Sequence, residues 1–367
     1  MKNNDAKKYN NIKLAIGIAK GIFSFFLIIA FVYFGYSKVV ESYLRSYSEN
    51  QYLLLLLFVV VIGIISSVIN SPIKYYVEFY LEHKYNLSNQ TFWKWIWEDL
   101  KGLLVGSVIG IPILLLFYWV MLTFGSVWWL VFAVAMFFIS VVLAQIVPII
   151  ILPIFYKITP IENEEIKKRI LRLAKDVKMK VANVFQFDMS KNTKKANAAF
   201  TGLGRTKRII LGDTLVNSYT EDEIETVLAH EFGHYKHKHI IKNLFIGTLS
   251  SFITFFAIAS LYELSLTWFG FTEITQVSAL PILSVWAMLI GLLTTPVGNI
   301  ISRKFEYEAD EYAIKATNKA EAFINTLEKL NDQNLGDKEP HPFVEWFFYS
   351  HPSVAKRKEK ILEHVNN

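Results

Sequence analysis

Long stretches without a charged residue are the main feature of the chain. Four of them reach or exceed the length of about 20 residues with which an apolar helix crosses a membrane. They run from Asn50 to Ile73, from Gly102 to Tyr156, from Asn243 to Tyr262 and from Ile274 to Ser302. A shorter fifth stretch follows Lys20. The pattern predicts a multi-pass integral membrane protein.

The uncharged stretches predict six transmembrane helices. The stretch from Gly102 to Tyr156 is too long for one crossing, and Thr123-Phe124-Gly125 is suited to a tight turn that divides it in two. The expected spans are Gly21 to Ser37, Tyr52 to Ile69, Leu103 to Leu122, Val127 to Ile151, Leu244 to Leu261 and Ala279 to Ile301. An even number of crossings places both termini on one side of the membrane.

Composition and charge refine this picture. Hydrophobic residues make up 53% of the chain and charged residues only 19%, which is too apolar for an ordinary soluble protein. The net charge is +6, but the three loops opposite the termini hold only Lys38 and Arg45 as cations. By the positive-inside rule the termini are cytosolic. The basic surplus is therefore an orientation signal, and we expect no nucleic-acid partner.

The spans divide the chain into four regions. Residues 1–156 form an N-terminal membrane domain with four transmembrane helices, and residues 243–302 supply two more. Residues 157–242 and 303–367 form the two parts of a split cytosolic domain, which together are long enough to bury a core.

The first cytosolic segment predicts a helix and a small β-sheet. Ile161 to Val177 has helical periodicity, whereas Asn183 to Phe187 and Ala198 to Leu211 read as short strands, the latter with a turn at Gly202-Leu203-Gly204. Thr220-Glu221-Asp222-Glu223 resembles a capping box that opens a helix running through His234.

That helix carries His230-Glu231-Phe232-Gly233-His234. On a helix, His230 and His234 lie one turn apart on one face, so that both imidazoles can reach one Zn²⁺. Glu231 lies about 100° around the helix, where it can contact a metal-bound water. The alternative interpretation is a pair of surface histidines on a polar helix.

A catalytic zinc needs a third protein ligand. The chain has no cysteine, so the ligand is His, Asp or Glu. His237 lies roughly 10 Å along a straight helix from His230, too far for the same ion. We therefore expect His237 and His239 to be solvated or near lipid headgroups, and the third ligand to come from another segment.

Residues Ser302 to Glu311 supply the candidate. Glu306 and Asp310 share a helical face, whereas Glu308 points away. We assign Glu306 to zinc and expect Asp310 to accept the outer N–H of a ligating histidine. Taken alone, the segment also fits a solvated acidic face.

These motifs resemble the type I CAAX prenyl endopeptidases, and more distantly the heat-shock membrane protease HtpX. The similarity runs from about Ile73 to His364. It includes Glu82 to Thr91, Pro153 to Pro160, Asn197 to Gly202, Lys207 to Leu211, the zinc motif, the Glu306 segment and Ser350 to Ser353.

The resemblance implies an intramembrane chamber capped by a metalloprotease domain. It implies His230, His234 and Glu306 as ligands and Glu231 as general base. It also implies that Asn197 and Ala198 lie on an edge strand that aligns the substrate, and that His351 and Arg357 act at the scissile carbonyl. From the residues alone, Asn197 could equally be a turn residue, and His351 and Arg357 could equally contact lipid headgroups. The family has seven spans, one more than expected here, which leaves closure of the chamber open.

We therefore expect a mostly α-helical integral membrane protein, with six transmembrane helices and a split cytosolic zincin-like metalloprotease domain containing a small β-sheet. Its expected function is that of a zinc endopeptidase that hydrolyses peptide bonds of peptide or protein substrates at the cytosolic face of the membrane, in contact with membrane lipid. The resemblance implies that it cleaves C-terminal residues from prenylated proteins. One alternative is a quality-control endopeptidase without a lipid requirement, and another is a transporter or lipid-binding scaffold. The signals fit a bacterial inner membrane and the endoplasmic reticulum equally, and leave the oligomeric state open.

Overall fold

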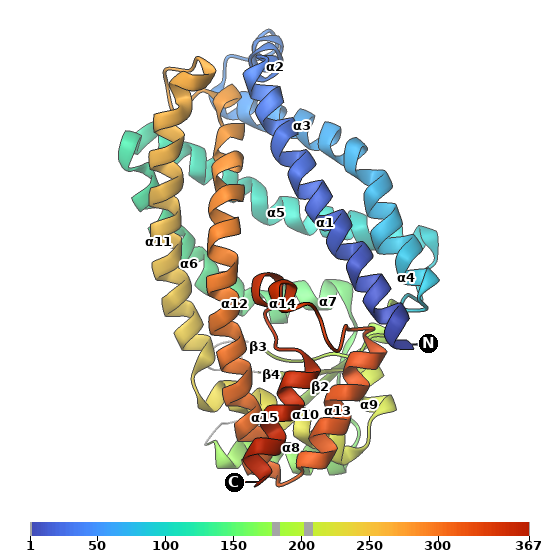
Figure 1. Ribbon diagram of the computed structural model, residues 1–367. Coiled ribbons are helices and arrows are strands. Elements are labelled where there is room, and N and C mark those ends of the chain that lie inside the picture. The colour runs from blue at the N-terminus through green and yellow to red at the C-terminus, as the bar shows by residue number, and fades with distance from the viewer. Residues whose placement is uncertain (1, 178–183, 202–207, 367) are drawn as a thin grey trace.

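Six long helices and a small mixed domain make up the protein. The structure is a computed structural model that describes residues 2–177, 184–201 and 208–366. The long helices are α1 (Lys2–Tyr33), α3 (Gln51–Lys74), α5 (Phe92–Phe124), α6 (Trp128–Ile146), α11 (His239–Ser265) and α12 (Pro281–Thr317). Figure 1 shows them as an elongated cage, with the sheet and the remaining long polar helices at one end.

Shorter helices connect and extend this framework. In the membrane region they are α2 (Tyr36–Arg45), α4 (Leu81–Lys84) and α7 (Leu152–Phe155), with π-helical turns at Tyr75–Tyr80 and Val147–Ile151. In the mixed domain they are α8 (Glu164–Asp176), α9 (Asp213–Ser218), α10 (Glu221–Lys236), α13 (Ala320–Gln333), α14 (Pro342–Phe348) and α15 (Val354–Asn366).

Five helical stretches in the described part of the chain are long and apolar enough to cross a membrane. They are Asn4–Tyr33, Gln51–Lys84, Phe92–Phe155, His239–Phe269 and Val277–Thr317. The third has 64 residues and contains both α5 and α6. A 3₁₀ turn at Gly125–Val127 joins these two helices, with Gly125 in the left-handed region at φ 55°. The expected turn is present, while the count of six crossings stays a prediction.

The outer surfaces of these helices are apolar. Val108, Phe245 and Leu293 are each more than 70% exposed. A soluble monomer rarely exposes such continuous apolar surface to water, whereas in a membrane the lipid tails cover this surface. The protein is therefore an integral membrane protein.

Among the described residues the sheet has four strands, in the order β1-β2-β4-β3. The strands are β1 (Ile158–Pro160), β2 (Val184–Phe187), β3 (Ala198–Thr201) and β4 (Arg208–Gly212). β2 and β4 are parallel and the other pairs antiparallel, with Ala198 opposite Leu211. β3 is thus an edge strand. The strands expected within 183–187 and 198–211 are present as β2, β3 and β4, whereas β1 was not expected. Asn183 itself and the turn expected at 202–204 lie outside the described residues.

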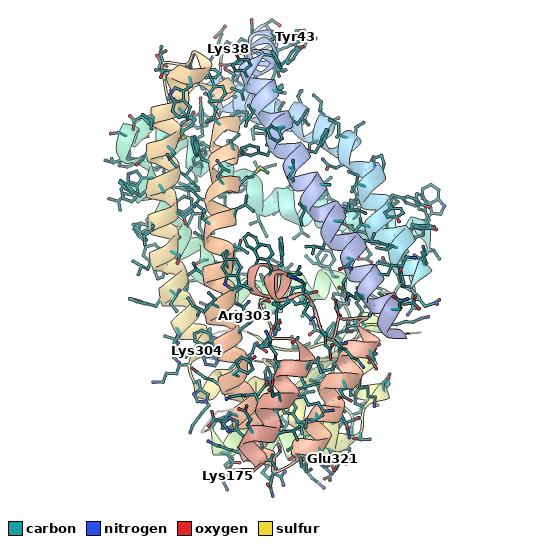
Figure 2. All side chains as sticks on the ribbon, in the orientation of Figure 1. Lys38, Tyr43, Lys175, Arg303, Lys304 and Glu321 are labelled. Carbon is teal, nitrogen blue, oxygen red and sulfur yellow. The ribbon has the colours of Figure 1, made fainter. Side chains whose placement is uncertain are left out.

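One apolar core joins the two polar segments of the chain. It contains Ile170 from α8, Leu211 from β4, Leu228 from α10 and Phe323 from α13, all nearly inaccessible to solvent. Both chain ends lie toward this end of the cage (Figure 1). In Figure 2, Lys175 and Glu321 mark the mixed domain, whereas Lys38 and Tyr43 mark the opposite end of the molecule.

Candidate active site

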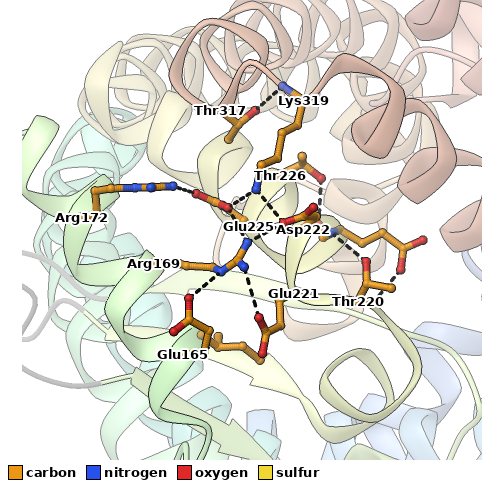
Figure 3. A network of polar contacts seen from close by, with 12 residues as sticks. Glu165, Arg169, Arg172, Thr220, Glu221, Asp222, Glu225, Thr226, Thr317 and Lys319 are labelled. Carbon is orange, nitrogen blue, oxygen red and sulfur yellow. Dashed lines mark hydrogen bonds and ion pairs between the residues drawn. The ribbon is translucent and has the colours of Figure 1, made fainter.

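Helix α10 begins at a capping box. The Thr220 hydroxyl accepts from the Glu223 backbone N–H, and the Glu223 carboxylate accepts from the Thr220 N–H at 2.8 Å, as the sequence predicts. The next turn is fixed by Asp222 and Glu225, which bind Arg169 from α8 and Lys319 at the start of α13 (Figure 3). The helix is thereby anchored before it reaches the cluster of histidines.

Helix α12 lies directly against α10. A Cβ atom at Gly233 would be only 2.8 Å from the Cα of Ala309, so only glycine permits this approach. The close contact brings Glu306 of α12 opposite His230 and His234.

These three residues form a compact cluster. One ligand atom from each of His230, His234 and Glu306 lies within 4.8 Å of the others. The Nε2 atoms of His230 and His234 are 3.2 Å apart, and each lies 3.4 Å from a Glu306 oxygen. Glu306 Oε2 is buried without a well-aligned hydrogen bond. Two imidazoles, one carboxylate and a buried acceptor fit a catalytic metal of the zinc type.

Asp310 and Arg357 support the His230 side of the cluster. His230 Nδ1–H donates to Asp310 Oδ1 at 2.8 Å, which leaves Nε2 facing the cluster. Arg357 from α15 donates to both oxygens of Asp310, through Nε at 2.8 Å and Nη2 at 2.5 Å. Burial would lower the pKa of Arg357, but the charge of Asp310 outweighs it and raises the pKa above its usual value. Arg357 is therefore a fixed cation.

The carboxylates make the cluster favourable for positive charge. Burial alone would lower the pKa of His230, but its hydrogen bonds with Asp310 and Glu306 prevail and raise the pKa to about 9. The centre of the cluster thus favours a cation, either a proton or a metal ion.

His351 lies on the open side of the cluster. Its Nδ1 is 2.9 Å from Glu306 Oε2, while its side chain is 65% exposed. Arg357 Nη1 lies 3.9 Å from the same oxygen. Both residues expected at the scissile carbonyl are therefore brought to Glu306, and His351 is the one that solvent reaches.

The remaining expected residues are on the same domain. Glu231 is half-buried on α10 between the two histidines in sequence. Asn197 is exposed directly before edge strand β3, and its carbonyl oxygen accepts from the Gly212 N–H at 2.9 Å. Ala198 is the first residue of β3, which packs against α10.

The expectation that His239 is solvated or near lipid headgroups was wrong. His239 is only 2% exposed, and its Nδ1 lies 2.9 Å from His234 Nδ1. Glu308 accepts from His239 Nε2 at 2.8 Å, so it reaches the cluster only through His239. Lys238 has φ 58°, a left-handed residue that ends α10 and turns the chain into α11. Because α10 ends at Lys236, the straight-helix argument made for His237 does not extend to His239, and a lysine gives no sequence signal for this turn.

His237 is half-buried and not fully solvated. Its ring stacks on His239 with centroids 5.6 Å apart. It too lies closer to the site than expected.

Comparisons with known proteins agree with this geometry. Residues 160–365, more than half of the chain, match the model of peptidase family M48. Residues 2–157 match the family described as CAAX prenyl protease N-terminal, five membrane helices.

Individual relatives cover most of the chain. An uncharacterized metalloprotease, YhfN of Bacillus subtilis, is 30% identical over 98% of this chain and 85% of its own. CAAX prenyl protease 1 of Saccharomyces cerevisiae is 35% identical over 76% of this chain and 65% of its own. The crystal structure of S. mikatae Ste24p superimposes with a TM-score of 0.87 at 29% identity, over 98% of this chain and 89% of that one. The chain therefore belongs to peptidase family M48 and is a membrane metalloendopeptidase related to CAAX prenyl protease 1.

Proposed function

We propose that the metal is Zn²⁺ and that His230, His234 and Glu306 hold it. The observation that carries this proposal is the compact cluster of two imidazoles and one carboxylate, the donor set of catalytic zinc sites. Zinc supplies a Lewis acid that polarises the scissile carbonyl and activates a water molecule.

The surrounding residues move and stabilise charge. Glu231, next to His230 and half-buried, takes a proton from the attacking water and returns it to the leaving amine. His351, exposed beside Glu306, donates a hydrogen bond to the carbonyl oxygen as negative charge develops there. Arg357 adds fixed positive charge through Nη1 while its other donors hold Asp310.

The substrate backbone binds to edge strand β3. A peptide can add to the free edge as a further strand, and the exposed Asn197 lies where such a strand would begin. Ala198 presents the first backbone groups of the strand.

The mixed domain faces the cytosol. The loops at the end of the cage far from the mixed domain carry few cations, Lys38 and Arg45, and both chain ends lie toward the opposite end. The shared core supports one split domain built from residues 157–242 and 303–367, with residues 1–156 and 243–302 forming six crossings.

The substrate is a prenylated protein C-terminus in preference to a bare one. An apolar cavity of about 710 Å³ lies within the cage and is lined by residues of α1, α3, α5, α6, α11 and α12. Its lining ends on α12 at Ala287, about 28 Å from Glu306 by the helical rise of 1.5 Å per residue, so a prenyl group has to extend from the site along α12 toward this cavity. Contact with membrane lipid follows from the apolar outer surface. The rival function, cleavage of misfolded membrane proteins, would need no lipid in this cavity.

Matched peptides test the substrate. Each CH₂ buried is worth about 0.8 kcal/mol, so a partly buried isoprenoid should raise kcat/KM at least about tenfold over the bare peptide in the same detergent. Glu231→Gln is the control: it should keep one zinc per chain but lose roughly 10²- to 10⁴-fold in turnover. Equal kcat/KM for the two peptides would favour the quality-control function, and full activity of the variant would remove Glu231 as the base.

A further inference from the structure

We propose that His239 and Glu308 are a pair of positioning residues that orient His234 toward the metal. Glu308 holds His239, and His239 holds His234. The inference rests on the proposed ligand set and adds a support for its second histidine.

Hydrogen bonding connects the three side chains in one line. His234 Nδ1 is 2.9 Å from His239 Nδ1, and His239 Nε2 is 2.8 Å from Glu308 Oε2. His234 thus has its Nε2 on the cluster side and its Nδ1 on the side of His239.

The positions of the ring protons determine which atom donates and which accepts in each of these hydrogen bonds. When His234 offers the Nε2 lone pair to a metal, its proton is on Nδ1 and has to be donated. His239 Nδ1 is then the acceptor, so its own proton is on Nε2 and is donated to the Glu308 carboxylate. The reverse direction would place a proton on His234 Nε2, facing His230 and Glu306, and would turn the bare Nε2 of His239 toward a carboxylate. Only the first arrangement satisfies all the atoms.

Packing holds His239 in this orientation. The ring is 2% exposed and stacks on Phe305 at a centroid distance of 4.1 Å and an interplanar angle of 8°. This packing shields the imidazole of His239 from water and favours the observed ring orientation.

His234 is hydrogen-bonded to a carboxylate as His230 is, but through one additional residue. Asp310 accepts from His230 directly, whereas Glu308 reaches His234 through His239. Three acids at alternate positions of α12 therefore serve one centre. Glu308 also lies 3.5 Å from Lys242 and 4.0 Å from Lys304, so a merely superficial ion-pair role is the alternative to exclude.

The test measures zinc affinity of the purified full chain by competition with a chromophoric chelator. His239→Phe keeps the ring and its stacking but removes both hydrogen bonds, and Glu308→Gln removes the anionic acceptor. Each should weaken zinc binding about 10- to 100-fold. The double variant should be no weaker than His239→Phe, because Glu308 acts through His239.

Two comparisons separate positioning from packing. His239→Asn places an amide oxygen near the Nδ1 position and should recover part of the affinity lost in His239→Phe. The double variant Lys242→Gln/Lys304→Gln removes both surface ion pairs of Glu308 and should bind zinc within about twofold of the wild type. Melting of the metal-free variants in chelator reports any loss of fold.

The outcomes are distinguishable. If His234→Ala loses zinc but His239→Phe and Glu308→Gln bind it as the wild type does, the pair is overturned and the ligand set stands. If Lys242→Gln/Lys304→Gln weakens binding as much as Glu308→Gln, the surface ion pairs explain the effect and the pair is overturned. If His239→Asn recovers none of the affinity and the metal-free protein melts early, the role is packing and the pair is likewise overturned. If the wild type binds no zinc, or His234→Ala binds it normally, the ligand set falls and the pair with it.

Discussion

His351 and Arg357 both lie beside Glu306 but differ in what else they contact. His351 is mostly exposed, whereas Arg357 is buried and commits two nitrogens to Asp310. His351→Ala should therefore bind zinc normally and lose about 10²- to 10³-fold in kcat, because its donor is used mainly on charge that develops in the transition state.

Arg357 provides the matched comparison. Arg357→Ala also leaves Asp310 without its cation, so zinc affinity should fall together with kcat. Metal titration and steady-state kinetics on the two variants check this contrast. A rise in KM alone for His351→Ala would mark that residue as a ground-state anchor instead.

The sequence could predict residues whose positions follow from regular helix geometry. The phase of Glu306 and Asp310 holds because α12 runs unbroken from Pro281 to Thr317. His239 could not be placed, because its position depends on the left-handed Lys238. The contact of Arg357 with Asp310 depends on how α15 packs across α12, which no local pattern encodes.

At the scale of elements, a charge network ties α10 to its neighbours. Glu225 is buried and accepts from Arg169 and Arg172 of α8 and from Lys319 before α13 (Figure 3). Burial would raise the pKa of Glu225, but these cations prevail and lower it below its usual 4.5. The resulting stabilisation is fully present above about pH 4.5 and is lost as the pH falls through the lower folded-state pKa.

Glu225→Gln should therefore destabilise the mixed domain by about 1–3 kcal/mol at neutral pH, since it leaves partly buried cations without their anion. Its melting temperature should also fall less on acidification than that of the wild type. Glu221→Gln is the control, because Glu221 meets Arg169 at the surface and its loss should cost under about 1 kcal/mol. Identical pH profiles for wild type and Glu225→Gln would show that the network adds no stability.

At the scale of the whole molecule, the cage separates two polar ends. Buried Glu41 of α2 accepts from the Ser278 N–H at 2.9 Å and closes the end far from the mixed domain. At the near end, the Glu82 carboxylate forms ion pairs with Lys13 of α1 and with Lys195, which precedes β3. The N–O distance is 2.9 Å in each. Glu82 thus links α1 by ion pairs to the segment that leads into the proposed substrate strand.

The absence of cysteine from the chain makes its orientation directly measurable. Tyr43→Cys and Glu321→Cys each introduce one thiol, at opposite ends of the molecule in Figure 2 and both at solvent-facing positions on the polar ends. If the mixed domain is cytosolic, a membrane-impermeant maleimide added to intact bacterial cells that express the protein in their inner membrane should label Tyr43→Cys. Glu321→Cys should react only after permeabilisation. The reverse pattern would invert the orientation, and labelling of both thiols in intact cells would contradict six crossings, because the two ends could not then lie on opposite sides of the membrane.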